Sequence, residues 1–418
     1  MMNEYNHGFK YMVFLTAVLL LSLSVTPSLA VETSLSNIYT SSTRDYWPTD
    51  GWMNSTPEEQ GMSSARLQQM IDHIVNDDLD VHSVIVIRHG YLVLEEYPDP
   101  FQGVSRTQSF NGTHYLYSVT KSFSSSLIGI AIDDGFIDNT NQTMLSFFPN
   151  HTIANINEQK ELVTLRDLLT MRSGLPWDET SAPFNSPEND VYQLNYNTSG
   201  GVQYVLDFPM EYGPDEVFHY NTGASHLLSG IVQETTGMST LEFARIHLFD
   251  PLGIDPVYWN TDSMGVCFGG YDLQLNPLDM AKFGYLYLNN GTWDNEQVIS
   301  TDWVNESTTT VTTLSTQRGY AYQWWTMPDI GVYYAAGLYG QYIFVSPEHD
   351  LVAVFTSGYG NGDIDENPSM FRNYILNAVT EAQPFVIPEL VLPVVVIAVV
   401  VFLVAIMKVQ SRSVSDSI

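Results

Sequence analysis

A serine and a lysine stand three residues apart in the segment Ser118-Val119-Thr120-Lys121. Residues at this spacing share one face of a helix, so the Lys121 amine can reach the Ser118 hydroxyl if the segment opens a helix. A serine hydroxyl becomes nucleophilic once a base takes its proton, and a desolvated neutral lysine can be that base. The pair therefore predicts nucleophilic catalysis, although a serine cap followed by a solvated lysine is the common meaning of such a tetrapeptide alone.

The residues after Ser118 predict the helix that this chemistry needs. Asp133-Asp134-Gly135 supplies a stop, and apolar residues recur before it at helical spacing: Phe123, Leu127, Ile130 and Ala131. The N–H groups at a helix start favour negative charge, which assists an ionising serine. Lysine is rare in the chain and occurs at Lys10, Lys121, Lys160, Lys282 and Lys408.

Further elements are predicted around this helix from hydrophobic periodicity and turn residues. Helices are expected at 63–75, 162–171, 227–236, 277–288 and 371–379. Strands are expected at 83–87, 91–97, 320–326, 332–336, 341–345 and 351–356. Because the strands lie at both sequence ends with helices between them, we predict an α+β fold over 57–380, with one antiparallel sheet and a helical insertion.

The two ends of the chain are expected to lie outside this domain. Residues 1–30 read as a secretory signal peptide, with an uncleaved anchor as the alternative, and 31–56 as a flexible lead-in. An uncharged apolar run within 388–408 predicts a C-terminal transmembrane helix, with a removable sorting signal as the alternative. Lys408 directly follows that run, so the tail 409–418 is expected in the cytoplasm and the catalytic domain outside the cell.

Composition excludes several classes of function. The formal net charge of −32 contains no basic patch, which argues against a nucleic-acid partner. The ten histidines show no metal-ligand spacing, so we predict neither a metal nor another cofactor. Cys267 is the only cysteine and reads as a small buried residue, so no intrachain disulfide can form. Seven sequons suggest a glycoprotein: Asn54, Asn111, Asn141, Asn150, Asn197, Asn290 and Asn305.

The chain resembles the serine β-lactamase and penicillin-binding-protein superfamily, in its class C β-lactamase-related branch of esterases, D-amino-acid peptidases and aminohexanoate-oligomer hydrolases. The resemblance rests on the Ser118 tetrapeptide and on the segments 164–175, 218–228, 251–254, 269–270 and 279–284. It implies a β-lactamase/transpeptidase-like fold with a helical subdomain. It also makes Tyr220 the partner of Lys121 in proton transfer, since a phenol beside an ammonium ionises more easily.

The resemblance implies further site residues and two departures. The backbone N–H groups of Ser118 and Leu338 are expected to form the oxyanion hole. Trp177, Thr222 and Gly337 are expected to contact substrate, with the loop 177–197 walling the site. Thr222 replaces the usual asparagine of the second motif. In the third motif Ala335-Ala336-Gly337 replaces Lys-Thr-Gly, so the glycine remains and the polar pair does not.

These observations predict a membrane-tethered serine hydrolase that acts on a small ester or amide through an acyl-enzyme. An esterase or amidase fits better than a true β-lactamase. A penicillin-binding-type peptidase or transpeptidase is one alternative. A catalytically silent cell-surface protein of the same fold is another, although the joint presence of Ser118, Lys121 and Tyr220 argues against it.

Overall fold

The computed structural model describes residues 44, 46–98, 112–358 and 366–380. The predicted signal peptide, transmembrane helix and cytoplasmic tail lie outside these residues. Within the described ranges, every helix is too short or too polar to cross a bilayer. The account below therefore concerns the domain that carries the Ser118 segment.

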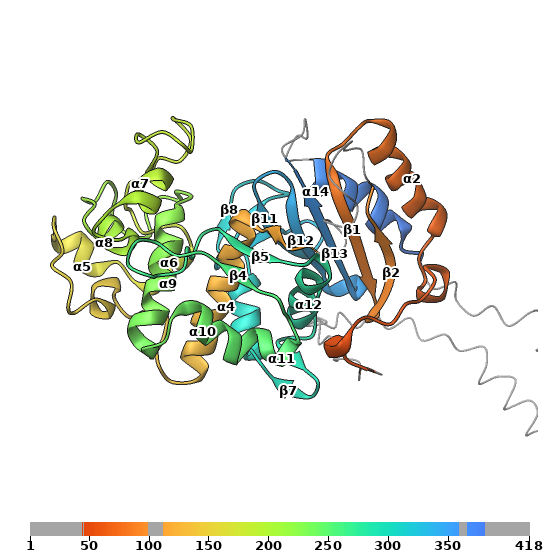
Figure 1. The fold of residues 1–418 in the computed structure, drawn as a ribbon, viewed down its shortest axis with the longest axis horizontal. Helices are drawn as coiled ribbons and strands as arrows, with labels where there is room; N and C mark the ends of the chain where they lie inside the picture. The colour runs from red at the N-terminus through yellow and green to blue at the C-terminus, as the bar shows by residue number, and fades with distance from the viewer. Residues whose placement is uncertain (1–43, 45, 99–111, 359–365, 381–418) are drawn as a thin grey trace, which may run out of the picture. The chain divides into compact units, whose positions relative to one another are not determined.

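An eight-stranded sheet forms the centre of the domain, in the order β2-β1-β13-β12-β11-β10-β9-β8 (Figure 1). Every neighbouring pair is antiparallel. Strand β1 pairs with β13, so the two ends of the described chain meet in one sheet, as the sequence predicts. The strands are β1 (Val81–Arg88), β2 (Tyr91–Glu96), β8 (Thr312–Thr313), β9 (Gly319–Tyr320), β10 (Trp325–Met327), β11 (Val332–Gly337), β12 (Gln341–Ser346) and β13 (Leu351–Ser357).

The sheet separates two hydrophobic cores. Along β1, Val84 and Val86 belong to one core, whereas Ile85 and Ile87 belong to the other, as the two-residue period of a strand requires. The smaller core lies under α2 (Ser64–Asn76), α14 (Glu366–Met370) and the π-helix η7 (Phe371–Leu376). The larger core includes α4 (Thr120–Asp133) and α12 (Pro277–Leu288) on the opposite face (Figure 1).

The region between β2 and β10 is mainly helical and contains the predicted insertion. Its remaining helices are η3 (Tyr117–Val119), η4 (Met144–Phe147), α5 (Glu158–Leu162), α6 (Leu165–Leu169), α7 (Asp190–Tyr196), α8 (Gly201–Leu206), α9 (Thr222–Thr236), α10 (Thr240–Ala244), η5 (Arg245–Phe249), α11 (Asp250–Leu252) and α13 (Thr301–Thr308). Two small sheets join β3 (His114–Tyr115), β5 (Leu273–Leu275) and β4 (Tyr258–Trp259), and β6 (Thr292–Trp293) with β7 (Glu296–Gln297).

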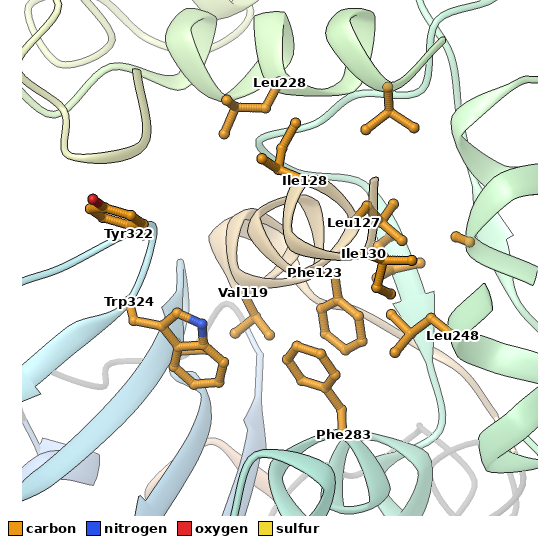
Figure 2. Packing of buried hydrophobic residues seen from close by; sticks show 14 of the residues in the cluster. Val119, Phe123, Leu127, Ile128, Ile130, Leu228, Leu248, Phe283, Tyr322 and Trp324 are labelled. Carbon is orange, nitrogen blue, oxygen red and sulfur yellow. The ribbon is translucent and has the colours of Figure 1, made fainter. Parts of the chain in front are cut away.

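Helix α4 passes through the middle of the larger core. Its residues from Thr120 to Ala131 are all buried, so it is enclosed on every side. Figure 2 shows the helix nearly end-on, with Leu228 of α9, Phe283 of α12 and Trp324 lying around it. The rings of Phe123 and Phe283 stack with centroids 3.7 Å apart. This packing fixes the helix that carries Lys121.

Several sequence predictions differ from the structure. The helix expected at 162–171 is shorter, because Thr164 caps the start of α6. The strand expected at 320–326 is broken into β9 and β10 because Gln323 has a positive φ of 62°. Its side-chain amide donates to the carbonyl oxygens of Leu168 and Leu169 at the end of α6, both at 3.0 Å. This buried contact favours a turn over a continuous strand.

The lead-in at 31–56 is also less loose than the sequence suggests, in the part that the structure describes. Arg44 forms a bidentate ion pair with Asp350, with both nitrogen–oxygen distances 2.7 Å. The Trp52 indole donates to the carbonyl oxygen of Leu278. This described part of the lead-in therefore belongs to the folded domain.

Candidate active site

Ser118 lies just before the N-terminus of α4, within the short 3-10 helix η3 (Tyr117–Val119). Tyr117 has a φ of 47°, so the chain makes a strained turn just before the serine. This turn holds Ser118 half-buried at the start of α4, while Lys121 is buried one turn further on. The structure thus brings the two predicted residues together, with Lys121 Nζ 3.0 Å from Ser118 Oγ.

Lys121 makes three hydrogen bonds, one for each N–H of an ammonium group. Its Nζ atom donates to Ser118 Oγ, to Thr222 Oγ1 at 3.0 Å and to the carbonyl oxygen of Gly270 at 2.9 Å. Its exposed fraction is 1%. Desolvation lowers the pKa of Lys121 to about 8, although the charge of Glu179 opposes this shift. An amine with this pKa can exchange a proton near neutral pH.

Tyr220 stands beside the serine and the lysine. Lys121 Nζ lies 4.8 Å from the centroid of the Tyr220 ring, and Tyr220 and Ser118 line the same pocket. The ring of Trp325 stacks on that of Tyr220. Desolvation raises the pKa of Tyr220 and Glu179 raises it further, so the phenol stays neutral at pH 7. This direction is opposite to the easier ionisation expected from the sequence, because burial and the charge of Glu179 outweigh the lowering effects of Ser118 and Arg318.

Thr222 begins α9, and the residue before it is the helix cap. The Asn221 side chain accepts a hydrogen bond from the N–H of Ala224 at 2.8 Å. Asn221 is therefore occupied in capping, whereas the Thr222 hydroxyl accepts the hydrogen bond from Lys121. The hydroxyl thus occupies the position where the resemblance implies an asparagine amide.

A buried acid–histidine pair that the sequence analysis did not single out holds Gly269, the residue before Gly270. His226 Nε2 lies 3.2 Å from Asp262 Oδ2, and both side chains are inaccessible to solvent. The N–H of Gly269 donates to His226 Nδ1 at 3.4 Å. A Cβ atom on Gly270 would come within 3.3 Å of Lys121 Nζ and closer still to Thr222. The pair and the two glycines together place a carbonyl oxygen against the lysine.

Strand β11 and the residue after it carry the third motif, part of which lines the same pocket as Ser118. Gly337 ends this strand, and Leu338, which follows it, lines the same pocket as Ser118. Of the two alanines, Ala336 lines the pocket, whereas Ala335 is buried in the larger core. The assignment of the Ser118 and Leu338 N–H groups to an oxyanion hole remains a prediction.

These residues line a pocket of about 390 Å³. Ser118, Tyr220, Thr222, Gly337 and Leu338 all contribute to its wall. Trp177 does not line it among the described residues. Instead, its indole packs against Gly223 and donates to Glu179 Oε2 at 2.5 Å.

Glu179 is a charged pocket residue that sequence reasoning missed. It lies within the loop 177–197, which was expected to wall the site, but no motif marks this carboxylate. Its Oε2 atom also accepts from the N–H of Thr222 at 3.3 Å. Groups of histidine, cysteine and carboxylate that could hold a metal ion are absent from the described residues.

Comparison with known proteins identifies the family of this chain. A family model described as Beta-lactamase matches residues 67–368. Protein flp from Staphylococcus aureus (strain MW2) is 28% identical over 194 residues, which cover 44% of this chain and 37% of that protein. The 6-aminohexanoate-dimer hydrolase from Paenarthrobacter ureafaciens is 23% identical over 320 residues, or 71% of this chain and 76% of the hydrolase. The chain therefore spans about a third of the length of one relative and three quarters of the other.

Solved structures share the fold. A putative 6-aminohexanoate-dimer hydrolase from Bacillus anthracis has a TM-score of 0.63 at 22% identity, covering 78% of this chain and 87% of that chain. EstCE1, a hydrolase with promiscuous acyltransferase activity, has a TM-score of 0.61 at 14% identity, with coverages of 78% and 99%. The family model matches well over half of the sequence and includes the Ser118 segment. The chain belongs to the Beta-lactamase family.

Proposed function

We propose that this protein is a serine hydrolase that cleaves small esters or amides through an acyl-enzyme on Ser118. One observation carries the proposal: a buried lysine with a pKa of about 8 has its Nζ atom 3.0 Å from the serine oxygen. A lysine held only as a structural cation gains nothing from such a lowered pKa. The esterase and amidase names among the similar proteins support the same reaction class.

The proposed steps conserve atoms and protons. Ser118 Oγ attacks the carbonyl carbon of the substrate while its proton passes to neutral Lys121. The bond to the leaving group then breaks, and the neutral Tyr220 hydroxyl donates the proton that the leaving group needs. Tyr220 regains a proton from the Lys121 ammonium. Water repeats the sequence on the acyl-enzyme and releases the acid.

The N–H groups of Ser118 and Leu338 are proposed to stabilise the oxyanion in both steps. Such donors lower the barrier because they already point at the position where negative charge develops. Backbone donors do not depend on side chains, so the loss of the lysine and threonine from the third motif leaves them in place. Neutral esters and amides are therefore suitable substrates.

A labelling experiment tests the nucleophile. A fluorophosphonate probe should modify the parent domain at one site, and Ser118→Ala should abolish that adduct. Ser125→Ala is the matched control, because Ser125 lies on the same helix and its buried hydroxyl has no hydrogen-bond partner among the described residues. Full labelling of the Ser118→Ala variant, or loss of labelling in Ser125→Ala, would contradict the assignment.

We also propose that the domain is exported and anchored by the apolar segment within 388–408. The sequence features at both ends support this proposal. Protease added to intact cells should then release the domain, and lysis should not be required. Protection of the whole domain until the cells are lysed would overturn this orientation.

A further inference from the structure

Few charged side chains line the pocket, and they do not pair with one another among the described residues. Among the described residues that line it, only Glu179 and Arg318 carry a full charge. The Arg318 guanidinium is exposed and lies over the ring of Trp325, 4.1 Å from its centroid. No ion pair joins it to Glu179 in the described part of the chain. The carboxylate therefore has no cationic side chain bound to it.

The hydrogen bonds of Glu179 hold one of its oxygen atoms in place. Its Oε2 atom accepts from the Trp177 indole and from the N–H of Thr222. No hydrogen bond to Oε1 occurs among the described residues. Lys121 cannot supply one, because its three N–H groups already have acceptors. The loop thus presents a fixed, half-buried negative charge to the pocket.

Aromatic rings form much of the remaining wall. The aromatic residues that line the pocket include Tyr117, Phe184, Tyr220, Tyr271, Trp325 and Tyr339. The faces of such rings attract cations, and the attraction grows when the cation is shielded from water. A carboxylate among aromatic rings is a combination that favours a positively charged amino group over an anion or a neutral group.

The charge of the whole protein acts in the same direction. Its formal net charge of −32 attracts cationic solutes and repels anionic ones at low ionic strength. A cationic substrate would therefore be both concentrated near the protein and bound inside the pocket. An anionic substrate would meet repulsion from the surface and then from Glu179.

We propose that this pocket selects substrates that carry a positively charged amino group, held by Glu179 and the surrounding aromatic rings. The inference rests on the proposed hydrolase function for its substrates, but the cation site itself can be tested by binding alone. It assigns to Glu179 a role in specificity, in addition to its effect on the pKa of Lys121.

Binding is measured first, on the Ser118→Ala variant, by calorimetry at pH 9.0. At this pH most Lys121 is neutral, given its pKa of about 8, while an alkylammonium is still charged. The probes are n-pentylammonium, n-pentanol and pentanoate. The ammonium should bind about tenfold more tightly than the alcohol, as a partly exposed charge-assisted contact implies. Pentanoate should bind most weakly.

Glu179→Gln is the informative substitution, because glutamine keeps an oxygen acceptor for Trp177 and Thr222 while it removes the charge. Added to Ser118→Ala, it should reduce the ammonium preference severalfold. Glu188→Gln is the matched control, since Glu188 lies on the same loop, is exposed and does not line the pocket. It should leave the preference unchanged.

Turnover is measured second, on the enzyme with Ser118 intact. Butyrylcholine and 3,3-dimethylbutyl butyrate have the same shape, but the first carries a positive nitrogen where the second has carbon. The choline ester should have the higher kcat/KM by about tenfold. The ratio should fall in Glu179→Gln and persist in Glu188→Gln. Because each ratio is taken within one variant, a general loss of activity does not affect it.

The outcomes separate the two proposals. Equal turnover of both esters would overturn the cation site while ester hydrolysis stands. If neither ester is cleaved but pentylammonium binds in a Glu179-dependent manner, the cation site stands and the hydrolase proposal fails. Tighter binding of pentanoate than of pentylammonium would overturn the inference and would instead identify Arg318 as the recognition group.

Discussion

Gly337 lies so close to the carbonyl oxygen of Leu116 that a Cβ atom added to this glycine would come within 2.3 Å of it. Leu116 immediately precedes η3, and Gly337 ends β11. This contact therefore joins the turn that holds Ser118 to the strand that leads to Leu338. It explains why the glycine of the third motif is present when the lysine and threonine are not.

Gly337→Ala should consequently separate the two proposed oxyanion donors. We expect kcat for a 4-nitrophenyl ester to fall by at least tenfold, since losing one such donor costs about 10²–10³ in rate. Gly331→Ala is the control. Gly331 precedes the same strand with a φ of 60° and has open space around it, so alanine there strains the turn and leaves the site alone. Equal activity of the two variants would argue against the close contact.

The pKa of Lys121 predicts the pH dependence of the reaction. Catalysis requires the neutral amine, so kcat/KM for an uncharged ester should rise with pH and level off above about 8. Below that value it should fall about tenfold per pH unit. Because Glu179 raises the pKa of Lys121, Glu179→Gln should shift the rising part of this pH profile to lower pH. If the rise in kcat/KM occurs at the same pH or at a higher pH in this variant, Glu179 does not raise the pKa of Lys121.

Removal of the Tyr220 hydroxyl tests proton transfer to the leaving group. Tyr220→Phe should lower turnover by roughly two to four orders of magnitude, the usual range for such a group. Tyr320→Phe is the control, because the Tyr320 ring packs against Tyr220 but does not line the pocket. Full activity of Tyr220→Phe on every substrate would make Tyr220 a packing residue.

The third motif predicts weak activity on β-lactams. A β-lactam has a carboxylate beside its scissile amide, and Ala336 offers it neither a charge nor a hydroxyl. Each missing hydrogen bond to a charged group costs about 1.5–3 kcal/mol. Nitrocefin should therefore be cleaved at least a hundredfold less efficiently than a short 4-nitrophenyl ester. Nitrocefin turnover equal to that of the ester would refute this prediction and the alignment of β11 with the third motif.

The buried pair of His226 and Asp262 makes a prediction about stability. Burial raises the pKa of Asp262, but hydrogen bonds from His226 and from backbone N–H groups outweigh it and lower the pKa to about 2. The stabilisation is therefore complete above the ordinary value near 4 and is lost as pH falls through about 2. Asp262→Asn should lower the free energy of unfolding at pH 7 by about 1–3 kcal/mol. Denaturant titration should show this difference shrinking toward pH 2.

Local geometry explains what the sequence could predict. Ser118 and Lys121 are three residues apart at a helix start, so their meeting depends only on the helix itself. The predicted bounds 277–288 match α12 because Pro277 opens that helix at a position where its missing N–H costs nothing. The antiparallel sheet follows from strands at both ends of the domain, and the Beta-lactamase family follows from the ordered motifs.

Only the tertiary structure decided the remainder of the site. The acidity of Tyr220 depends on the rings that desolvate it, and these come from strands about a hundred residues away in the chain. The carbonyl oxygen of Gly270 carries no side-chain signal, so no motif could mark it as an acceptor for Lys121. Glu179 is one acidic residue among 47 aspartates and glutamates. It becomes distinctive only when Trp177 and Thr222 fix its carboxylate in the pocket, because long-range contacts give an ordinary side chain its environment.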